Sequence, residues 1–137
     1  MAAAQRRFEG GLEQTVAARD WIGALLAAHG VVGDEVDAFR LAVTEAATNI
    51  FRHAYAGKIP AAFELRVEVE MEAVITHILD EGQTFAPGEV RAPDPEALAE
   101  GGYGLFLIHS LMDEVSFTPA TPRGTVLRMK KHRRPHA

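Results

Sequence analysis

The chain has no cysteine, which excludes a disulfide framework and any thiol chemistry. No apolar stretch is long enough to cross a bilayer, and the opening MAAAQRRFEG lacks the apolar core of a signal peptide. The chain also lacks an excess of basic charge, and its net charge of −5 argues against a general nucleic-acid surface. We therefore expect a soluble, cytoplasmic protein with no membrane or nucleic-acid partner.

The length of 137 residues predicts one domain (residues 1–137) around a single core. The basic tail, residues 130–134 (KKHRR), is expected to be a frayed, solvated terminus. The six histidines show no pair with convincing ligand spacing, so we expect no zinc site.

One expected helix carries polar side chains along one side. The segment LAVTEAATNIFRHAY places an acidic residue and an amide one helical turn apart. At about 100° per residue, an apolar arc faces the core. The opposite arc holds Glu45, Asn49, Arg52 and His53, with Leu41 at its upper end. A solvated helix face is the plain alternative. The small neighbours Ala46, Ala47 and Thr48 suit the floor of a site better.

Those residue types suit magnesium and phosphate chemistry. Mg²⁺ prefers oxygen ligands and binds through one or two protein oxygens together with substrate phosphates. The amide oxygen of Asn49 can join it without the repulsion that a second carboxylate would bring. Glu45 can orient a water or accept a proton from an attacking hydroxyl. Arg52 can place its guanidinium against phosphate oxygens, and His53 lines the site at most.

A second motif follows an apolar run. Residues 73–79 are predicted to form a central strand buried on both faces, which ends at Asp80. A carboxylate at this strand end, with Gly82 allowing close backbone approach, can accept a hydrogen bond from the exocyclic amine of adenine. Taken alone, DEG is better explained as ordinary turn chemistry.

A third motif opens an apolar helix. Gly101, Gly102 and Gly104 precede LFLIHSLM. A helix that begins in glycines presents free backbone N–H groups and the positive end of its dipole, which favours phosphate. A lone G-x-G is a turn as often as a site.

In this order the three motifs resemble the N, first and second glycine boxes of the GHKL ATPase/kinase superfamily. Within it, LAVTEAATNIFRHAY, DEGQTFAP, GGYGLFLIHSLMDEV and GTVLRMKK look like the anti-sigma-factor serine/threonine kinases, over residues 8–131. One departure is visible, because Thr84 stands where the superfamily often writes the second glycine of D-x-G-x-G.

The resemblance implies an α/β sandwich (α+β) of the GHKL, or Bergerat, type, with helices on one face of a mixed, mostly antiparallel sheet. It implies an ATP lid at residues 81–101 and the cofactors ATP and Mg²⁺. Glu45 is the expected catalytic residue, and Asn49 the expected Mg²⁺ ligand. The expected nucleotide-binding residues are Asn49, Arg52, His53, Asp80, Gly82, Phe85, Gly101, Gly102, Tyr103, Gly104, Leu105 and Thr125.

Around the motifs, the sequence predicts further strands and a helix. Residues 8–14 are a candidate edge strand, and residues 15–29 a helix that Gly30 ends. Residues 63–71 alternate apolar and charged side chains, as in a strand with one buried face. Residues 115–118 and 125–130 are predicted to form a final strand pair joined by a Pro/Gly turn.

Two functions remain open. By resemblance, the chain is a kinase that phosphorylates an anti-sigma-factor antagonist and sequesters a sigma factor, as a homodimer formed through its N-terminal strand and first helix. Arg19 and Trp21 are candidate contacts there, although Trp21 could equally be core. The alternative is a regulator of the same fold that binds nucleotide without catalysis. A function without nucleotide would require three coincidental motifs.

Overall fold

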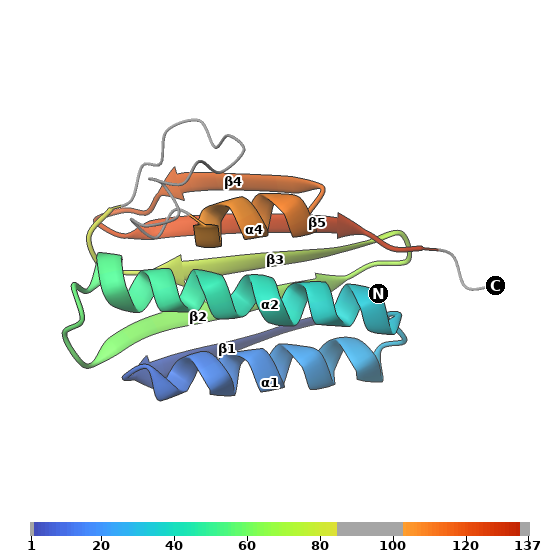
Figure 1. The fold of residues 1–137 in the computed structure, drawn as a ribbon, viewed down its shortest axis with the longest axis horizontal. Helices are drawn as coiled ribbons and strands as arrows, with labels where there is room; N and C mark the ends of the chain where they lie inside the picture. Colours follow the sequence, from blue (N-terminus) through green and yellow to red (C-terminus); the bar gives the residue numbers. More distant parts are fainter. Residues whose placement is uncertain (1, 85–102, 135–137) are drawn as a thin grey trace.

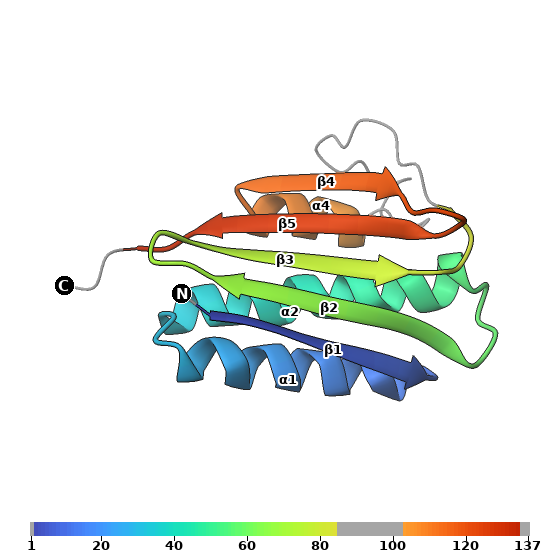
Figure 2. The same ribbon diagram turned by 180° about the vertical axis from the view of Figure 1, so that it is seen from behind.

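The computed structural model describes residues 2–84 and 103–134, which form one antiparallel sheet with helices on one side (Figures 1 and 2). In chain order the elements are β1 (Ala2–Gly10), α1 (Glu13–Ala28), α2 (Gly33–Asn49), the π-helix η1 (Ile50–Ala54), β2 (Ala61–Val69), β3 (Ala73–Asp80), α4 (Tyr103–Leu111), β4 (Glu114–Pro119) and β5 (Thr125–His132).

The strands lie in the order β1-β2-β3-β5-β4, and every pair among the described strands is antiparallel. Figure 1 shows α1, α2 and α4 in front of the sheet, and Figure 2 shows the opposite face without a helix over it. The expected α+β sandwich with helices on one face is confirmed. The final pair β4–β5 is also confirmed, with bounds extended by one or two residues.

The alternating pattern of β2 places its apolar side chains toward the helices. Phe63, Leu65 and Val67 are at most 5% exposed, and burying each such side chain contributes about 1.5–3 kcal/mol. The prediction that Met71 continues this buried row is wrong, because the strand ends at Val69 and Met71 is 87% exposed in the following turn.

The central strand β3 differs from its expectation. Val74, Thr76 and Ile78 face the helices and are buried, but Ile75, His77 and Leu79 are only half-buried. The prediction of burial on both faces is therefore wrong. In an antiparallel sheet with one covered face, neighbouring side chains alone screen the other face.

The N-terminal elements are displaced from their predicted positions. The edge strand is Ala2–Gly10 instead of residues 8–14, and α1 begins at Glu13. The stop at Gly30 is confirmed, since its φ of +78° is a left-handed conformation that glycine adopts freely. Trp21 is half-buried and packs edge-on against Phe8, with ring centroids 6.0 Å apart, so it belongs to the core.

The prediction of a frayed basic tail is wrong for residues 130–134. Lys131 Nζ donates a hydrogen bond to the Leu111 carbonyl (2.8 Å), and Arg133 donates to the carbonyls of Glu70 (2.8 Å) and Gly30 (3.1 Å). Arg134 contacts the Glu35 carboxylate through both its backbone N–H (3.0 Å) and its Nε (3.3 Å). Residues 131–134 therefore contact the ends of four elements: α4, β2, α1 and α2.

Within residues 2–84 and 103–134, no helix combines the length and the apolar character needed to span a membrane.

Candidate functional site

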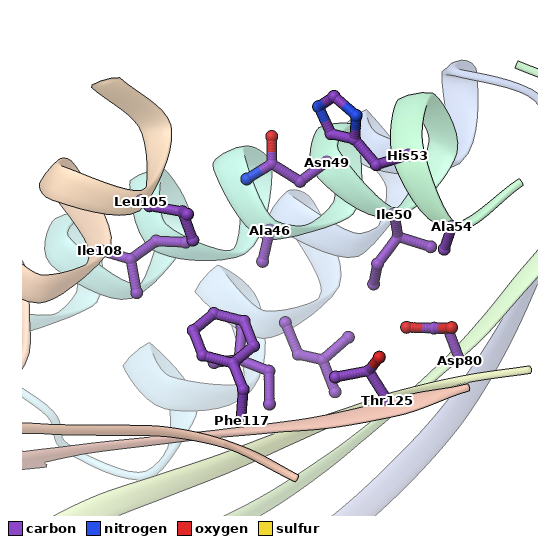
Figure 3. Close-up of a pocket in the computed structure, with 12 residues that line it drawn as sticks. Ala46, Asn49, Ile50, His53, Ala54, Asp80, Leu105, Ile108, Phe117 and Thr125 are labelled. Carbon is purple, nitrogen blue, oxygen red and sulfur yellow. The ribbon is translucent and has the colours of Figure 1, made fainter. Parts of the chain in front are cut away.

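The upper wall of the site is the C-terminal half of α2 and the π-helix that follows. Ala46, Ile50 and Ala54 point toward the sheet, whereas Asn49 and His53 point away from it (Figure 3). Glu45, one turn before Asn49, is half-buried, as is Asn49 itself. The predicted division of this helix into an apolar and a polar side is thus present in the structure.

The end of this wall is a π-helix, Ile50–Ala54. Tyr55 N–H donates to the carbonyl of Ile50, five residues back, at 3.2 Å. Such wide turns often occur at functional sites. Here the turn carries Arg52 and His53, both exposed. Two residues later the Tyr55 hydroxyl accepts a hydrogen bond from Glu81 N–H (3.1 Å) and donates one to the Ala62 carbonyl (2.7 Å).

Gly104, in the first turn of α4, brings the glycine motif to the Glu45–Asn49 pair. A Cβ built on Gly104 would lie 2.8 Å from Glu45 Oε2 and 3.8 Å from Asn49 Oδ1. The absence of a side chain therefore lets the start of α4 lie directly against the two polar groups of α2. Two motifs that are far apart in the sequence meet at this point.

Asp80 closes the other side of the site. It is 5% exposed at the end of β3 and accepts a hydrogen bond from Gly82 N–H at 2.9 Å. Burial raises the pKa of the Asp80 carboxyl, and hydrogen bonds from the Gly82 and Thr125 backbones partly offset that rise. The carboxylate therefore has few interactions that compensate for its burial.

Gly82 is packed against the end of η1. A Cβ on Gly82 would overlap the backbone carbonyl of Ala54, to which Gln83 N–H donates at 2.7 Å. Glycine is thus required for the close approach of the strand end to the helix end.

These residues surround a pocket of about 460 Å³, part of which is open to solvent (Figure 3). Its wall is mainly apolar, with a few polar groups. The lining residues are Ala46, Asn49, Ile50, His53, Ala54, Ile78, Asp80, Leu105, Ile108, Phe117, Thr125 and Leu127.

The structure brings together most of the expected site residues that it describes. Asn49, His53, Asp80, Leu105 and Thr125 line the pocket, Glu45 and Gly104 meet beside it, and Gly82 lies behind Asp80. Arg52 is exposed on η1 and is not among the lining residues. Phe85, Gly101, Gly102 and most of the expected lid lie outside the described residues, and for Tyr103 only its place at the start of α4 is described.

Sequence reasoning missed several residues that hold the site. Tyr55 ties the end of η1 to β2 and β3, Phe117 lines the pocket from β4, and Arg123 and Gly124 contact the segment after β3. Periodicity gives no signal for them, because these contacts join segments that are distant in the chain. The glycine in RGTVL was the one usable hint.

The residues present fit ATP and Mg²⁺. Gly104 lets the N-terminal turn of α4 lie against Glu45 and Asn49, and the backbone N–H groups of a helix N-terminus favour phosphate. Asn49 offers an amide oxygen of the kind that Mg²⁺ accepts. Asp80 places a buried carboxylate in the pocket wall, where it can accept from an amine. Among the described residues, no cluster of three His, Cys, Asp or Glu side chains could hold a metal by itself. The expected metal would therefore need substrate oxygens as well.

The fold and the pocket together indicate the class of α+β ATP-binding domains, and a comparison with known families agrees. The model of the histidine kinase-like ATPase domain matches residues 8–131, and the chain belongs to that family.

Within the family, the chain is similar to proteins named serine-protein kinase RsbW. It is 38% identical to the one of Halalkalibacterium halodurans over 112 residues, which cover 74% of this chain and 65% of that protein. The Staphylococcus aureus relative is 35% identical over 116 residues (75% of this chain, 69% of that protein), and the Bacillus pumilus relative 35% over 99 residues (63% and 59%). The chain thus spans less than two thirds of the length of the Halalkalibacterium halodurans and Bacillus pumilus relatives.

A solved structure has the same fold. The crystal structure of the RsbU and RsbW domains of Rv1364c from Mycobacterium tuberculosis aligns with a TM-score of 0.68 at 16% identity. The alignment covers 96% of this chain and 33% of that chain.

Proposed function

We propose that the protein is a Mg²⁺- and ATP-dependent serine/threonine kinase that phosphorylates an anti-sigma-factor antagonist and sequesters a sigma factor, in the cytoplasm. The observation that carries this proposal is the meeting of Gly104 with Glu45 and Asn49 beside the pocket that holds Asp80. The names of the relatives support the transfer of phosphate to a protein serine.

Each group has a role that follows from its position. Asp80 accepts a hydrogen bond from the adenine amine, and the apolar wall of Ile50, Leu105 and Ile108 excludes water from the base. The start of α4 directs backbone N–H groups toward the phosphates. Glu45, on the same side of α2 as Asn49, accepts the proton of the attacking serine or threonine hydroxyl.

Asn49 would hold the metal through its side-chain oxygen. When bound, Mg²⁺ neutralises the charge on the phosphate oxygens during transfer. His53 lies at the pocket wall near Asn49 and is proposed to contact the nucleotide, as is Arg52 from the exposed side of η1.

The second candidate is a regulator that binds nucleotide but does not transfer phosphate. Such a binder has use for Asn49 and the start of α4 at Gly104 but little use for a base. Because Glu45 lies beside Gly104, with Oε2 2.8 Å from a Cβ placed on Gly104, the site favours the kinase.

The kinase is tested by incubating the protein with labelled ATP, Mg²⁺ and a purified candidate antagonist. Wild type should label the antagonist. Asn49→Ala removes the proposed metal ligand, and Asn49→Asp adds negative charge beside the triphosphate, so both should abolish transfer while circular dichroism stays unchanged. Transfer by folded Asn49→Ala at the wild-type rate would show that this residue is wrongly assigned.

Glu45→Gln separates binding from chemistry. It keeps the shape and hydrogen bonds of the side chain but removes the base. We expect ATP affinity, measured by calorimetry, to change little while turnover falls about 10²–10⁴-fold, the usual effect of losing a general base. Equal losses of affinity and turnover would show that Glu45 is a structural or binding residue and not the base.

We further propose a homodimer formed through β1 and α1. β1 is an edge strand that pairs only with β2 among the described strands, and Leu12 and Val16 nearby expose 47% and 48% of their surface. An exposed apolar patch beside a free strand edge is suited to a second copy. Arg19, whose side chain is 39% exposed and pairs with its neighbour Asp20, remains a candidate contact, whereas Trp21 packs against Phe8.

Light scattering at micromolar concentration should give the mass of a dimer. Val16→Glu should shift that mass toward the monomer by placing charge in the interface. The matched control is Met71→Glu, since Met71 is more exposed but lies in the β2–β3 turn. A wild-type monomer, or equal effects of both substitutions, would contradict the proposed interface.

A further inference from the structure

The turn between β4 and β5, residues 120–124, reaches across to the segment that follows Asp80. Arg123 Nε donates a hydrogen bond to the Gly82 carbonyl at 3.2 Å. Next to it, Gly124 N–H donates to the Thr84 hydroxyl at 3.3 Å. These two bonds join segments about forty residues apart in the chain, and both end on the glycine box that carries Asp80.

The turn fits closely because of Gly124. Its φ of +102° is one that residues with a side chain rarely adopt, and a Cβ there would overlap the Asp80 carbonyl. Backbone therefore lies directly on backbone at the end of β3. A bulkier residue at position 124 would separate the turn from Asp80.

The same segment is held from its other side by the end of η1. Gln83 N–H donates to the Ala54 carbonyl, and Glu81 N–H donates to the Tyr55 hydroxyl. Residues 81–84 are thus fixed between η1 and the β4–β5 turn. Movement of either support would shift Gly82, whose N–H donates to the Asp80 carboxylate.

We propose that Thr84 and Arg123 are positioning residues that set how strictly Asp80 distinguishes adenine from other bases. This inference rests on the proposed nucleotide site. Thr84 stands where a second glycine is common in the superfamily, and its hydroxyl supplies the anchor that a glycine cannot. Arg123 holds the carbonyl side of Gly82, while the N–H side of Gly82 bonds to Asp80.

Arg123 is exposed, and it lines a hollow on the helix-free side of the sheet together with Arg7, Arg66 and Glu81. Arg7 pairs with Glu9 at 3.6 Å. Substitution of Arg7 thus provides a matched control: an arginine of the same hollow is lost, but the bond to Gly82 remains.

The test compares the affinities for ATP and ITP, in which a carbonyl oxygen replaces the exocyclic amine of adenine. Wild type should bind ATP more tightly. Thr84→Val and Arg123→Ala should each reduce the ATP/ITP affinity ratio by about 2–10-fold, the effect of losing one solvent-accessible hydrogen bond. Thr84→Ser, which keeps the hydroxyl, and Arg7→Ala should preserve the ratio.

The outcomes separate the two levels of inference. A wild type that binds ATP no better than ITP would contradict adenine recognition by Asp80, and thus the proposed site. A wild type that prefers ATP, with the ratio unchanged in Thr84→Val and Arg123→Ala, would overturn the positioning role alone. General destabilisation of the fold would lower the affinities for ATP and ITP equally and leave their ratio unchanged. That outcome would also contradict the positioning role.

Discussion

In its proposed role of binding the adenine amine, Asp80 must meet two requirements that oppose each other. Binding an amine requires the ionised carboxylate, but burial disfavours that charge and raises the pKa of Asp80 above the ordinary value of 3.8. The hydrogen bonds from Gly82 and Thr125 recover part of this cost. Stability and binding should therefore respond to pH in opposite directions.

We predict opposite pH dependences of stability and ATP affinity when wild type is compared with Asp80→Asn, which keeps the shape of the side chain without its charge. Well below pH 3.8 the carboxyl is protonated in both the folded and the unfolded chain, so burial of charge costs nothing. As pH rises from about 3.8 to the raised pKa of the folded chain, the free energy of unfolding of wild type should fall relative to Asp80→Asn, and the difference should then stay constant. Over the same range the affinity of wild type for ATP should rise.

Urea unfolding and calorimetry across this pH range would measure both effects. The affinity of Asp80→Asn should be weaker at neutral pH and nearly independent of pH through the same range. Parallel pH profiles for the two proteins would mean that another group controls recognition.

The segment after β3 lies close to the end of η1 because Gly82 has no Cβ. Gly82→Ala would force the Ala54 backbone away, so we predict a loss of about 1–3 kcal/mol in the free energy of unfolding, typical of overpacking. Nucleotide affinity should fall as well, because Asp80 moves with this segment. Both would be measured on the same samples, by urea unfolding and calorimetry.

Gly33→Ala is the control, since a Cβ there meets no atom within 4 Å. At the start of α2 it should leave affinity unchanged and leave stability unchanged or slightly higher. An equal loss of affinity in both variants would remove the special role of position 82.

The sequence predicted those elements that have a strong period of their own. The polar side of α2 and the alternation of β2 are local patterns, and both are present. The start of α4 was marked by glycines, whose use becomes clear only when Glu45 lies opposite. Thus the residues of three motifs could be named, but not their mutual contacts.

The wrong predictions have physical reasons. Ile75 and Leu79 read as fully buried because an apolar run does not show that one sheet face lacks a helix. Residues 2–7 of β1 have no alternation to detect, since an edge strand exposes most of its side chains. The sequence predicts a frayed tail because no local pattern reveals the hydrogen bond of Arg134 to Glu35, which is 99 residues away in the chain.

Across the molecule, Arg134 joins the end of the chain described here to the start of α2. The Glu35 side chain is 4% exposed, its Oε2 accepts both bonds from Arg134, and its Oε1 is buried with no partner among the described residues. A carboxylate buried in this way depends on its few donors. The Arg134 side chain, however, is 63% exposed, so solvent weakens the pair.

We predict that Arg134→Ala lowers the free energy of unfolding by more than the loss of a surface pair but by less than the loss of a fully buried one. The backbone N–H of residue 134 still serves Glu35, which limits the loss. Arg7→Ala, which breaks a pair exposed on both sides, should change stability by less than about 0.5 kcal/mol. Equal effects in urea unfolding would show that the burial of Glu35 adds nothing.

Both ends of the described chain lie at one end of the sheet, away from the pocket (Figures 1 and 2). Ala2 pairs with Val69 and His132 with Ala73, on either side of the β2–β3 turn, whereas Asp80 and Thr125 pair at the opposite end. Ala2 and Arg134 therefore lie at the end of the sheet that is remote from the pocket. This arrangement is compatible with fusion to other domains at either end. A fluorescent protein fused at either end should therefore leave ATP binding unobstructed.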